Sequence, residues 1–287
     1  MTIFNVTGGG GGGLTFKDMT SGSYEIKASD WGNHYTSLPA NYFYNDILIQ
    51  KITIPNSITQ LGSSCFYGDV SLKDVALPSS ITSLPNNCFY NCSSLKNIDL
   101  SSVTSIDNSV FNACTALQNV SLSNNLTTMG QSAFAYSGLR GIIIPNTLLS
   151  IPNSAFTHCT QLEDVTLHNA IAGIGTNAFE YTAIKNFVVP PLVTVINSNT
   201  FNWCTSLEDI TIPTSVTSIG NYAMRHIGTN TTNGTTIRML PTTPPTITSN
   251  ILSSAFINKI IVPQGSLTAY QTATNWSAYA SYMEEAP

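Results

Sequence analysis

The chain has 287 residues, a formal net charge of −5 and only 9% charged side chains, whereas an ordinary globular domain carries about 25%. Its ten Lys and Arg residues cannot supply the basic surface with which a protein neutralises nucleic-acid phosphates. No segment approaches the roughly 18–20 consecutive apolar residues of a membrane-spanning helix. We therefore expect neither a nucleic-acid partner nor insertion into a membrane.

Residues 1–30 are expected to form a glycine-rich leader and an N-terminal cap. The six consecutive glycines from Gly8 to Gly13 lack the Lys-Ser or Lys-Thr sequel of a phosphate-binding loop. The first basic residue is Lys17, and the segment after Met1 runs into the glycines, so no secretion signal is visible. We interpret the glycine run as a flexible or close-packing leader that would suit a joint to a larger assembly.

A repeat of 22 or 23 residues dominates residues 31–227 and accounts for about nine coils. One slot, the anchor, holds phenylalanine in eight successive units and methionine in the ninth: Phe43, Phe66, Phe89, Phe111, Phe134, Phe156, Phe179, Phe201 and Met224. Around each anchor the pattern F-x-x-C-x-x-L-x-x-I-x-I-P-x-x-V-T-x-I-x-x-x-A recurs. Self-similarity at a fixed period of this size indicates a solenoid.

One unit illustrates how the repeat is expected to fold. After Leu72, the apolar residues Val75 and Leu77 alternate with Asp74 and Ala76, which predicts a short strand with one buried face. Proline follows this strand in five units and ends it, because proline has no N–H to donate. No unit can bury its apolar residues alone, so the units must stack, with adjacent strands in parallel.

This repeat resembles the leucine-rich repeat of the BspA-like, or Treponema-type, family, whose unit has 23 residues. The resemblance extends over roughly residues 31–283 and is carried by eight or nine matches in register. It implies a leucine-rich repeat solenoid that is mostly β, with short parallel strands, an irregular opposite side and little helix except a C-terminal cap. It also implies a surface-exposed protein that binds host proteins or other cells.

Residues 228–287 are expected to hold an insertion, a final strand and a helical C-terminal cap. The interval from Met224 to Phe256 is 32 residues rather than 22 or 23. Its Gly, Asn and Pro content is typical of turns and extended segments. We predict a hairpin-like bulge that leads into the cap.

The end of the chain looks like the usual C-terminal ending of the family. Ser266 is a candidate cap for a helix that buries Leu267, Tyr270 and Ala273. Trp276 is expected to cover the last coil, since the open end of a solenoid exposes apolar core and a strand edge.

The six cysteines occupy two slots of the repeat. One slot lies three residues after the anchor and the other just before it: Cys92, Cys114, Cys159 and Cys204 in the first, and Cys65 and Cys88 in the second. We interpret them as small buried hydrophobic residues, since no paired C-x-x-C spacing for zinc occurs. Neighbouring coils bring Cys65 near Cys88 and Cys92 near Cys114, and whether either pair forms a disulfide stays open.

The sequence contains no recognised catalytic pattern. The four histidines, His34, His158, His168 and His226, fall in a cap, in variable turns or in a post-strand slot, and no G-x-S-x-G elbow occurs. Adjacent acids such as Glu163 and Asp164 point in different directions on a strand, so they suit a carboxylate dyad poorly. We expect no enzyme activity, no catalytic residue, no metal ligand and no cofactor.

Two surfaces are candidates for binding a partner. The first is the strand face, formed by the outward positions of the strand in each unit; its candidate partner-binding residues are Thr53, Asp74, Asn97, Asp99, Asn119, Asp164 and Asp209. It is polar and acidic, and would either dock a protein or glycan or simply keep the sheet solvated.

The second surface is an aromatic row in the turn after the anchor, formed by Tyr136, His158, Tyr181, Trp203 and His226. Stacked coils would align these rings, which would either bind a sugar or stack on one another. Tyr136 and Tyr181 occur only in the shortened units that lack cysteine, so they are also candidates to fill the vacated cysteine space.

The leading hypothesis is a non-enzymatic recognition or adhesion module that binds a protein or glycan through its repeat surface, outside the cell at a bacterial surface. The missing secretion signal keeps an alternative open. In it the chain is a bacteriophage or prophage virion protein, associated with the tail, with a structural or receptor-binding role. Such a protein is assembled inside the cell and needs no signal.

Overall fold

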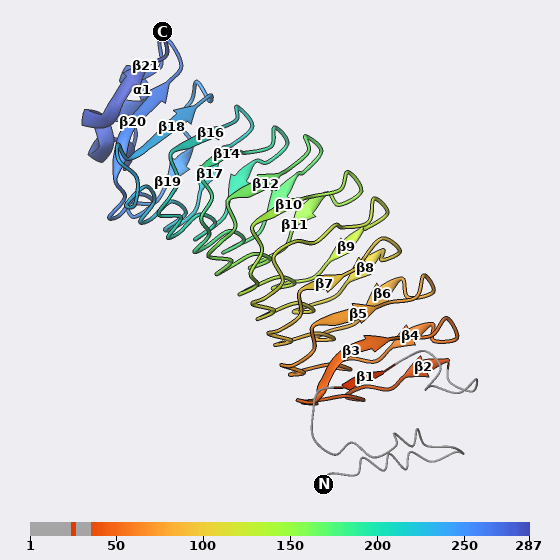
Figure 1. Ribbon diagram of the computed structural model, residues 1–287. Helices are drawn as coiled ribbons and strands as arrows, with labels where there is room; N and C mark the ends of the chain where they lie inside the picture. The colour runs from red at the N-terminus through yellow and green to blue at the C-terminus, as the bar shows by residue number, and fades with distance from the viewer. Residues whose placement is uncertain (1–23, 27–35) are drawn as a thin grey trace.

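The computed structural model describes residues 24–26 and 36–287, which form an elongated stack of about 11 coils (Figure 1). In Figure 1 the coils follow one another from the N-terminal end at the lower right to the C-terminal end at the upper left. The expected leucine-rich repeat solenoid of short parallel strands is confirmed. The glycine run, Lys17 and His34 lie outside the described residues.

The first column of strands carries the strand face. Its strands, all parallel to their neighbours, are β1 (Tyr24–Ile26), β3 (Ile49–Thr53), β5 (Asp74–Ala76), β7 (Asn97–Ile98), β10 (Gly141–Ile143), β12 (Asp164–Thr166), β14 (Asn186–Val188), β16 (Asp209–Ile212), β18 (Thr235–Met239), β20 (Ile257–Val262) and β21 (Met283–Glu285). The predicted alternation holds in β5, where Val75 is buried and Ala76 is exposed. The column is interrupted between β7 and β10, where Leu100 and Leu122 form an isolated bridge.

The second column lies after the post-strand turn of each coil. Its short parallel strands are β2 (Ser37–Leu38), β4 (Gln60–Leu61), β6 (Ser83–Leu84), β8 (Ser105–Ile106), β9 (Thr128–Met129), β11 (Ser150–Ile151), β13 (Gly173–Ile174), β15 (Val195–Ile196), β17 (Ser218–Ile219) and β19 (Thr246–Ile247). In almost every strand the second residue is buried and the first is more exposed. Each coil therefore sends one apolar group from this column into the core.

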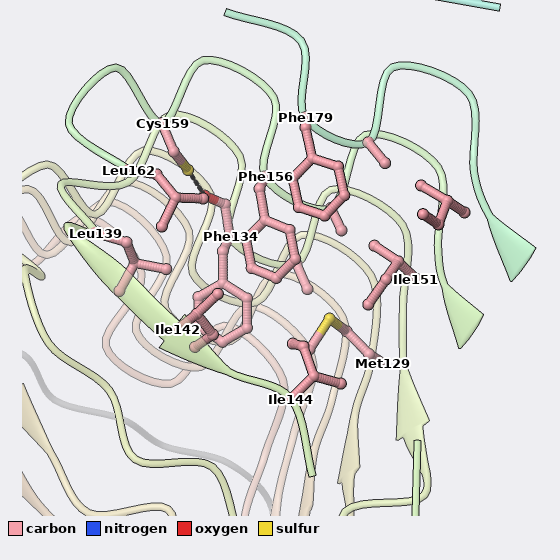
Figure 2. Close-up of a cluster of buried hydrophobic side chains, with 14 of the residues drawn as sticks. Met129, Phe134, Leu139, Ile142, Ile144, Ile151, Phe156, Cys159, Leu162 and Phe179 are labelled. Carbon is pink, nitrogen blue, oxygen red and sulfur yellow. Dashed lines mark hydrogen bonds between the residues drawn. The ribbon is translucent and has the colours of Figure 1, made fainter. Parts of the chain in front are cut away.

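The anchor turns form the third side, which is irregular in secondary structure but regular in hydrogen bonding. The backbone N–H of Phe134 donates to the carbonyl of Ala155 in the next coil, and the N–H of Phe156 donates to that of Ala178, both at 2.9 Å. The buried rings of Phe134 and Phe156 stack at 5.9 Å, and Phe156 stacks on Phe179 at 5.6 Å (Figure 2). The anchors thus build one continuous core along the stack, as the repeat predicts.

The prediction of a hairpin-like bulge after Met224 is wrong. Strand β18 pairs in parallel with β16 on one side and β20 on the other, and β19 pairs in parallel with β17. The segment therefore forms one more coil of the solenoid. Its extra residues lie mainly in the turns of Gly228–Gly234, where Gly228 and Gly234 adopt φ of 66° and 79°.

The anchor of this longer coil is Leu252 rather than Phe256. The N–H groups of Met224 and His226 donate to the carbonyls of Ile251 and Ser253, which flank Leu252 as the anchor of every earlier coil is flanked. Leu252 is 3% exposed, whereas Phe256 is 46% exposed. Alignment by residue type selected Phe256 because phenylalanine fills most anchors, but the backbone register selects the buried leucine.

The C-terminal cap contains the helix α1 (Leu267–Thr272), the 3₁₀ helix η2 (Trp276–Tyr282) and β21. Ser266 precedes α1 as predicted, but its side chain makes no capping hydrogen bond. Instead, the carboxylate of Glu285 accepts hydrogen bonds from the N–H groups of Gly265 at 2.9 Å and Leu267 at 3.4 Å. A strand distant in sequence thus caps the helix, which local sequence cannot reveal.

The cap covers the two sheet edges in different ways. Strand β21 pairs with the edge of the first column. At the edge of the second column, buried Tyr270 donates its hydroxyl to the carbonyl of Pro241, and buried Trp276 donates its indole N–H to that of Pro245, both at 2.8 Å. Asn275 adds a bond to the carbonyl of Ile247 at 2.8 Å. The expected covering of the last coil by Trp276 is confirmed, and the carbonyls that no further coil could pair are satisfied.

Candidate functional site

The strand face aligns its predicted polar residues in a column across the coils. Asp74 of β5 lies beside Asn97 of β7, and the Asn97 side-chain amide donates to the Asp74 carboxylate at 3.2 Å. Asp164 of β12 lies beside Gly141 of β10, and Asp209 of β16 lies beside Asn186 of β14. The register therefore brings these Asp and Asn side chains to one side of the sheet, which is the arrangement that a binding surface on the strand face needs.

All seven candidate residues of the strand face reach solvent. Asn97, Asp99, Asn119 and Asp164 are exposed, and Thr53, Asp74 and Asp209 are half-buried: no member is in the core. Some of these groups already have partners within the chain. The guanidinium of Arg238 binds Asp209 at 2.8 Å. The N–H of Ser101 donates to Asp99 at 2.9 Å, and this bond, together with the Ser101 side chain, lowers the pKa of Asp99.

The sequence interpretation missed that the strand face also exposes aliphatic side chains. Ile143 is 71% exposed and Val188 is 70% exposed, each at an outward position of its strand. The repeat itself could have revealed this exposure, because both residues occupy the outward slot that holds Ala76 or Thr166 in other coils. The strand face is therefore not uniformly polar: it combines acidic and amide groups with two exposed aliphatic side chains.

A groove of about 570 Å³ crosses three coils of the strand face. Its walls come from the interrupted coil and from β10 and β12, and include Asn119, Ser121, Ile143, Asp164 and Thr166. Its lining combines apolar groups, the amides of Asn119 and Asn124, hydroxyls and one carboxylate. This is a surface that can contact both apolar and polar groups of a partner.

The aromatic row is a continuous stack of five rings. Tyr136 and His158 lie 4.4 Å apart between ring centroids, and His158 and Tyr181 lie 4.3 Å apart. The stack continues from Tyr181 to Trp203 at 5.4 Å and from Trp203 to His226 at 3.9 Å. Each inner ring has a neighbour on both faces. The row therefore presents ring edges to solvent, while a sugar packs on ring faces.

The backbone of the aromatic row is left-handed at every position. The φ angles are 57° at Tyr136, 58° at His158, 57° at Tyr181, 60° at Trp203 and 55° at His226. This conformation suits glycine and asparagine and costs other residues roughly 1–2 kcal/mol. The preceding coils place Asn45, Gly68, Asn91 and Ala113 in this slot. Ring stacking contributes about 0.5–1.5 kcal/mol per pair, which is comparable to this backbone cost.

Tyr136 and Tyr181 do not fill the space left by the missing cysteines, contrary to that interpretation. Tyr136 is 48% exposed. The slot three residues after the anchor is filled by Ser137 and Thr182, whose hydroxyls lie 3.3 Å from the Sγ atoms of Cys159 and Cys204 respectively. The shortened units thus replace a buried thiol with a buried hydroxyl.

The same slot holds a carboxyl group in the first coils. Asp46 and Asp69 lie three residues after their anchors and are 8% and 0% exposed. The carboxylate of Asp46 accepts the N–H groups of Leu48 at 2.8 Å and Ile49 at 3.2 Å. Burial raises the pKa of Asp69 to about 9, so this side chain is protonated at neutral pH.

All six cysteines are free and buried, so neither of the two disulfides left open by the sequence is formed. The Sγ atom of Cys159 donates to the carbonyl of Phe134, the anchor of the preceding coil, at 3.0 Å (Figure 2). Cys92, Cys114 and Cys204 make the same contact at 3.0–3.1 Å. Burial raises the pKa of every thiol, to about 11 for Cys159 and about 12 for Cys204. These thiols are structural donors rather than nucleophiles.

The histidines of the described residues also have structural contacts. His168 lies 3.0 Å from the carbonyl of Leu148 through Nε2, and its Nδ1 accepts the N–H of Ala170 at 3.3 Å. Burial is the larger cause that lowers the pKa of His226, and the positive charge of the nearby Arg225 is the smaller one.

Across residues 24–26 and 36–287, no three His, Cys, Asp or Glu side chains gather in a way that could hold a metal ion. In the same part of the chain, no helix has both the length and the apolar character to span a bilayer.

Comparison with solved structures places the fold among bacterial leucine-rich repeat proteins. A leucine-rich repeat protein of T. pallidum matches with a TM-score of 0.50 and 19% identity, over 55% of this chain and 76% of that one. A leucine-rich repeat protein from Bacteroides ovatus matches with a TM-score of 0.49 and 20% identity, over 92% and 84%. A leucine rich cell surface protein from Faecalibacterium prausnitzii matches with a TM-score of 0.41 and 20% identity, over 89% and 92%.

None of the curated proteins with which the sequence was compared matches it. The family model of the BspA type leucine rich repeat region matches six copies, over residues 36–163 and 132–237. These ranges contain the Phe anchors, the parallel strands from β2 to β17 and the buried cysteines described above. The chain belongs to the BspA-type leucine-rich repeat family.

Proposed function

We propose that this chain is a non-enzymatic recognition and adhesion module that binds a protein partner through the strand face, at a bacterial cell surface. The observation that carries the proposal is the exposure of Ile143 and Val188 among aligned Asp and Asn side chains. Neither aliphatic side chain is needed to complete the core, since both point outward. Membership of the BspA-type family supports an interaction role, because a repeat scaffold presents an extended surface.

A protein partner is favoured over a glycan by the chemistry of this face. Aliphatic side chains surrounded by polar groups are typical of the centre of a protein interface. The aromatic row, which is the alternative platform for a sugar, has its inner ring faces covered by neighbouring rings. These features favour the strand face over the aromatic row as the partner surface.

The test compares two matched substitutions in one coil. Val188→Asp places a charge on the strand face, and Leu192→Asp does the same at a 55% exposed position outside it. The probes are immobilised mucins, matrix proteins and a glycan panel, read by surface plasmon resonance. We expect binding to a protein probe that Val188→Asp weakens by about tenfold or more and Leu192→Asp leaves unchanged. Equal loss in both variants, or binding to glycans alone, would contradict the proposal.

Location is tested separately on cells that make the protein. Antibodies against the folded chain should label intact cells before permeabilisation. Labelling that appears only on purified phage particles would favour the virion-associated alternative. A hydrolase activity of the chain on any bound probe would contradict the non-enzymatic role.

A further inference from the structure

Gly141 lies where the column of Asp and Asn side chains on the strand face loses a side chain. It is beside Asp164 in the parallel register of β10 and β12. In the preceding coil, Asn119 holds the equivalent position and lines the same groove. The column therefore reads Asn119, Gly141, Asp164, with a hollow at the glycine.

No backbone requirement explains this glycine. A Cβ atom at Gly141 would lie 3.5 Å from the carbonyl oxygen of Asp164 and 3.6 Å from its Cβ, which is ordinary contact, and its φ is not left-handed. Gly62 and Gly130 differ, because a Cβ there would lie 2.2 Å and 2.4 Å from backbone atoms of the preceding coil. Glycine inside a strand weakens it and often marks close approach of a ligand or another backbone.

The hollow has an apolar side and an acidic side. Ile143, two residues along β10, is 71% exposed and forms the apolar wall. Asp164 is exposed and is the one charged residue among those that line the groove in the described part of the chain. Its neighbour Glu163 forms the direct ion pair with Lys185 at 2.6 Å. Lys185 also interacts with Asp164 at longer range, and the Asp164 carboxylate stays exposed to a partner.

We propose that the hollow at Gly141 is a docking site for an extended segment of a partner protein that carries a Lys or Arg beside an aliphatic residue. The basic group binds Asp164, the aliphatic side chain packs on Ile143, and the partner's main chain approaches the bare backbone of Gly141. The amide of Asn119 and the hydroxyls of Ser121 and Thr166 also line the groove, so they can bond the partner's peptide groups. This inference rests on the proposed function and narrows it to one part of the strand face.

The occupant follows from complementarity of charge and shape. Among the described residues, the lining of the groove supplies a carboxylate and no cation, and the whole chain has a net charge of −5, which favours a basic partner. No aromatic ring lines the groove among the described residues, so it lacks the flat platform on which sugars stack. A peptide segment fits both features.

The experiment selects partners from a displayed library of random twelve-residue peptides against the full chain. Enriched peptides are then synthesised, and their dissociation constants are measured by fluorescence anisotropy. Gly141→Val fills the hollow, and Asp164→Asn removes its charge. Gly173→Ala is the matched control, because this glycine of β13 also has open space around its Cβ position but lies in the second column.

We expect the enriched peptides to share a Lys or Arg next to an aliphatic residue, and to bind Gly141→Val and Asp164→Asn about tenfold or more weakly. Gly173→Ala should bind as the parent chain does. Gly141→Val should keep a melting temperature at or above that of the parent, since valine is favoured in strands. A loss of binding in that variant then reports occupancy of the hollow rather than unfolding.

Two results separate the failure of this inference from failure of the proposed function. Some peptides could bind Gly141→Val as tightly as the parent chain but fail to bind Val188→Asp. That result would disprove docking in the hollow at Gly141 and leave the strand face as the partner surface. The absence of any enriched peptide would overturn the docking site at Gly141 and leave the proposed function to its own test with protein probes. Peptides insensitive to all strand-face substitutions would contradict both.

Discussion

The carboxyl group of Asp69 accepts a hydrogen bond from the backbone N–H of Asp46 at 2.8 Å through Oδ1, while its buried Oδ2 atom has no hydrogen-bond partner among the described residues. These two acids occupy the slot that holds thiols or hydroxyls in later coils, as at Cys92 and Ser137. Burial raises the pKa of Asp69 from 3.8 to about 9. The N-terminal end of the core therefore contains a carboxyl group that folds in its protonated form.

Asp69 should make stability fall as pH rises. The folded state holds a proton that the unfolded chain releases, so the free energy of unfolding is unaffected below about pH 4 and falls up to about pH 9. The slope for one such group is at most about 1.4 kcal/mol per pH unit. Urea unfolding of the parent between pH 5 and pH 8 measures it. Asp69→Asn keeps an acceptor for the Asp46 N–H and cannot titrate, so its profile should be flatter; parallel profiles would disprove the assignment.

Trp203→Asn tests whether the aromatic row stacks on itself or binds sugars. Asparagine tolerates the left-handed backbone at this position, φ 60°, which offsets the lost contacts with Tyr181 and His226. We expect the free energy of unfolding to change by less than about 1 kcal/mol and binding to a glycan panel to stay the same. Loss of glycan binding in a variant that still unfolds cooperatively would instead support the sugar platform.

Tyr270→Phe should weaken the C-terminal cap without changing its packing. The substitution removes the hydroxyl that donates to the carbonyl of Pro241 at 2.8 Å, and leaves that buried carbonyl without this partner. The expected loss is about 1–3 kcal/mol of unfolding free energy, measured by thermal and urea denaturation. Tyr282→Phe is the control, because Tyr282 is 43% exposed; equal effects of the two substitutions would argue against capping by the hydroxyl.

The six cysteines should be unreactive in the folded protein. They are buried, and burial raises their pKa values, so little thiolate is available at pH 8. Iodoacetamide should modify none of them in native buffer and all six in denaturant, with or without prior reduction. A lower count without reductant would show that a disulfide forms after all.

The sequence alone determined the solenoid, because the repeat specifies both the buried slots and the strand period. Phe156 and Val75, for example, could be assigned to the core from their positions in the pattern, and both are buried. The strand face followed from the same alternation. Residue type was a poorer guide where the repeat lost its regular length: it favoured Phe256 over Leu252 and a hairpin over another coil.

The tertiary structure decided what depends on the register between coils. Only that register shows that Glu285 caps α1 from a strand distant in the sequence, and that the rings of Tyr136 to His226 cover one another's faces. The register also places Gly141 between Asn119 and Asp164, so that the missing side chain leaves a hollow in the groove. Periodicity specifies which side chains are buried, whereas contacts between residues one coil apart depend on how far each coil is shifted along the next.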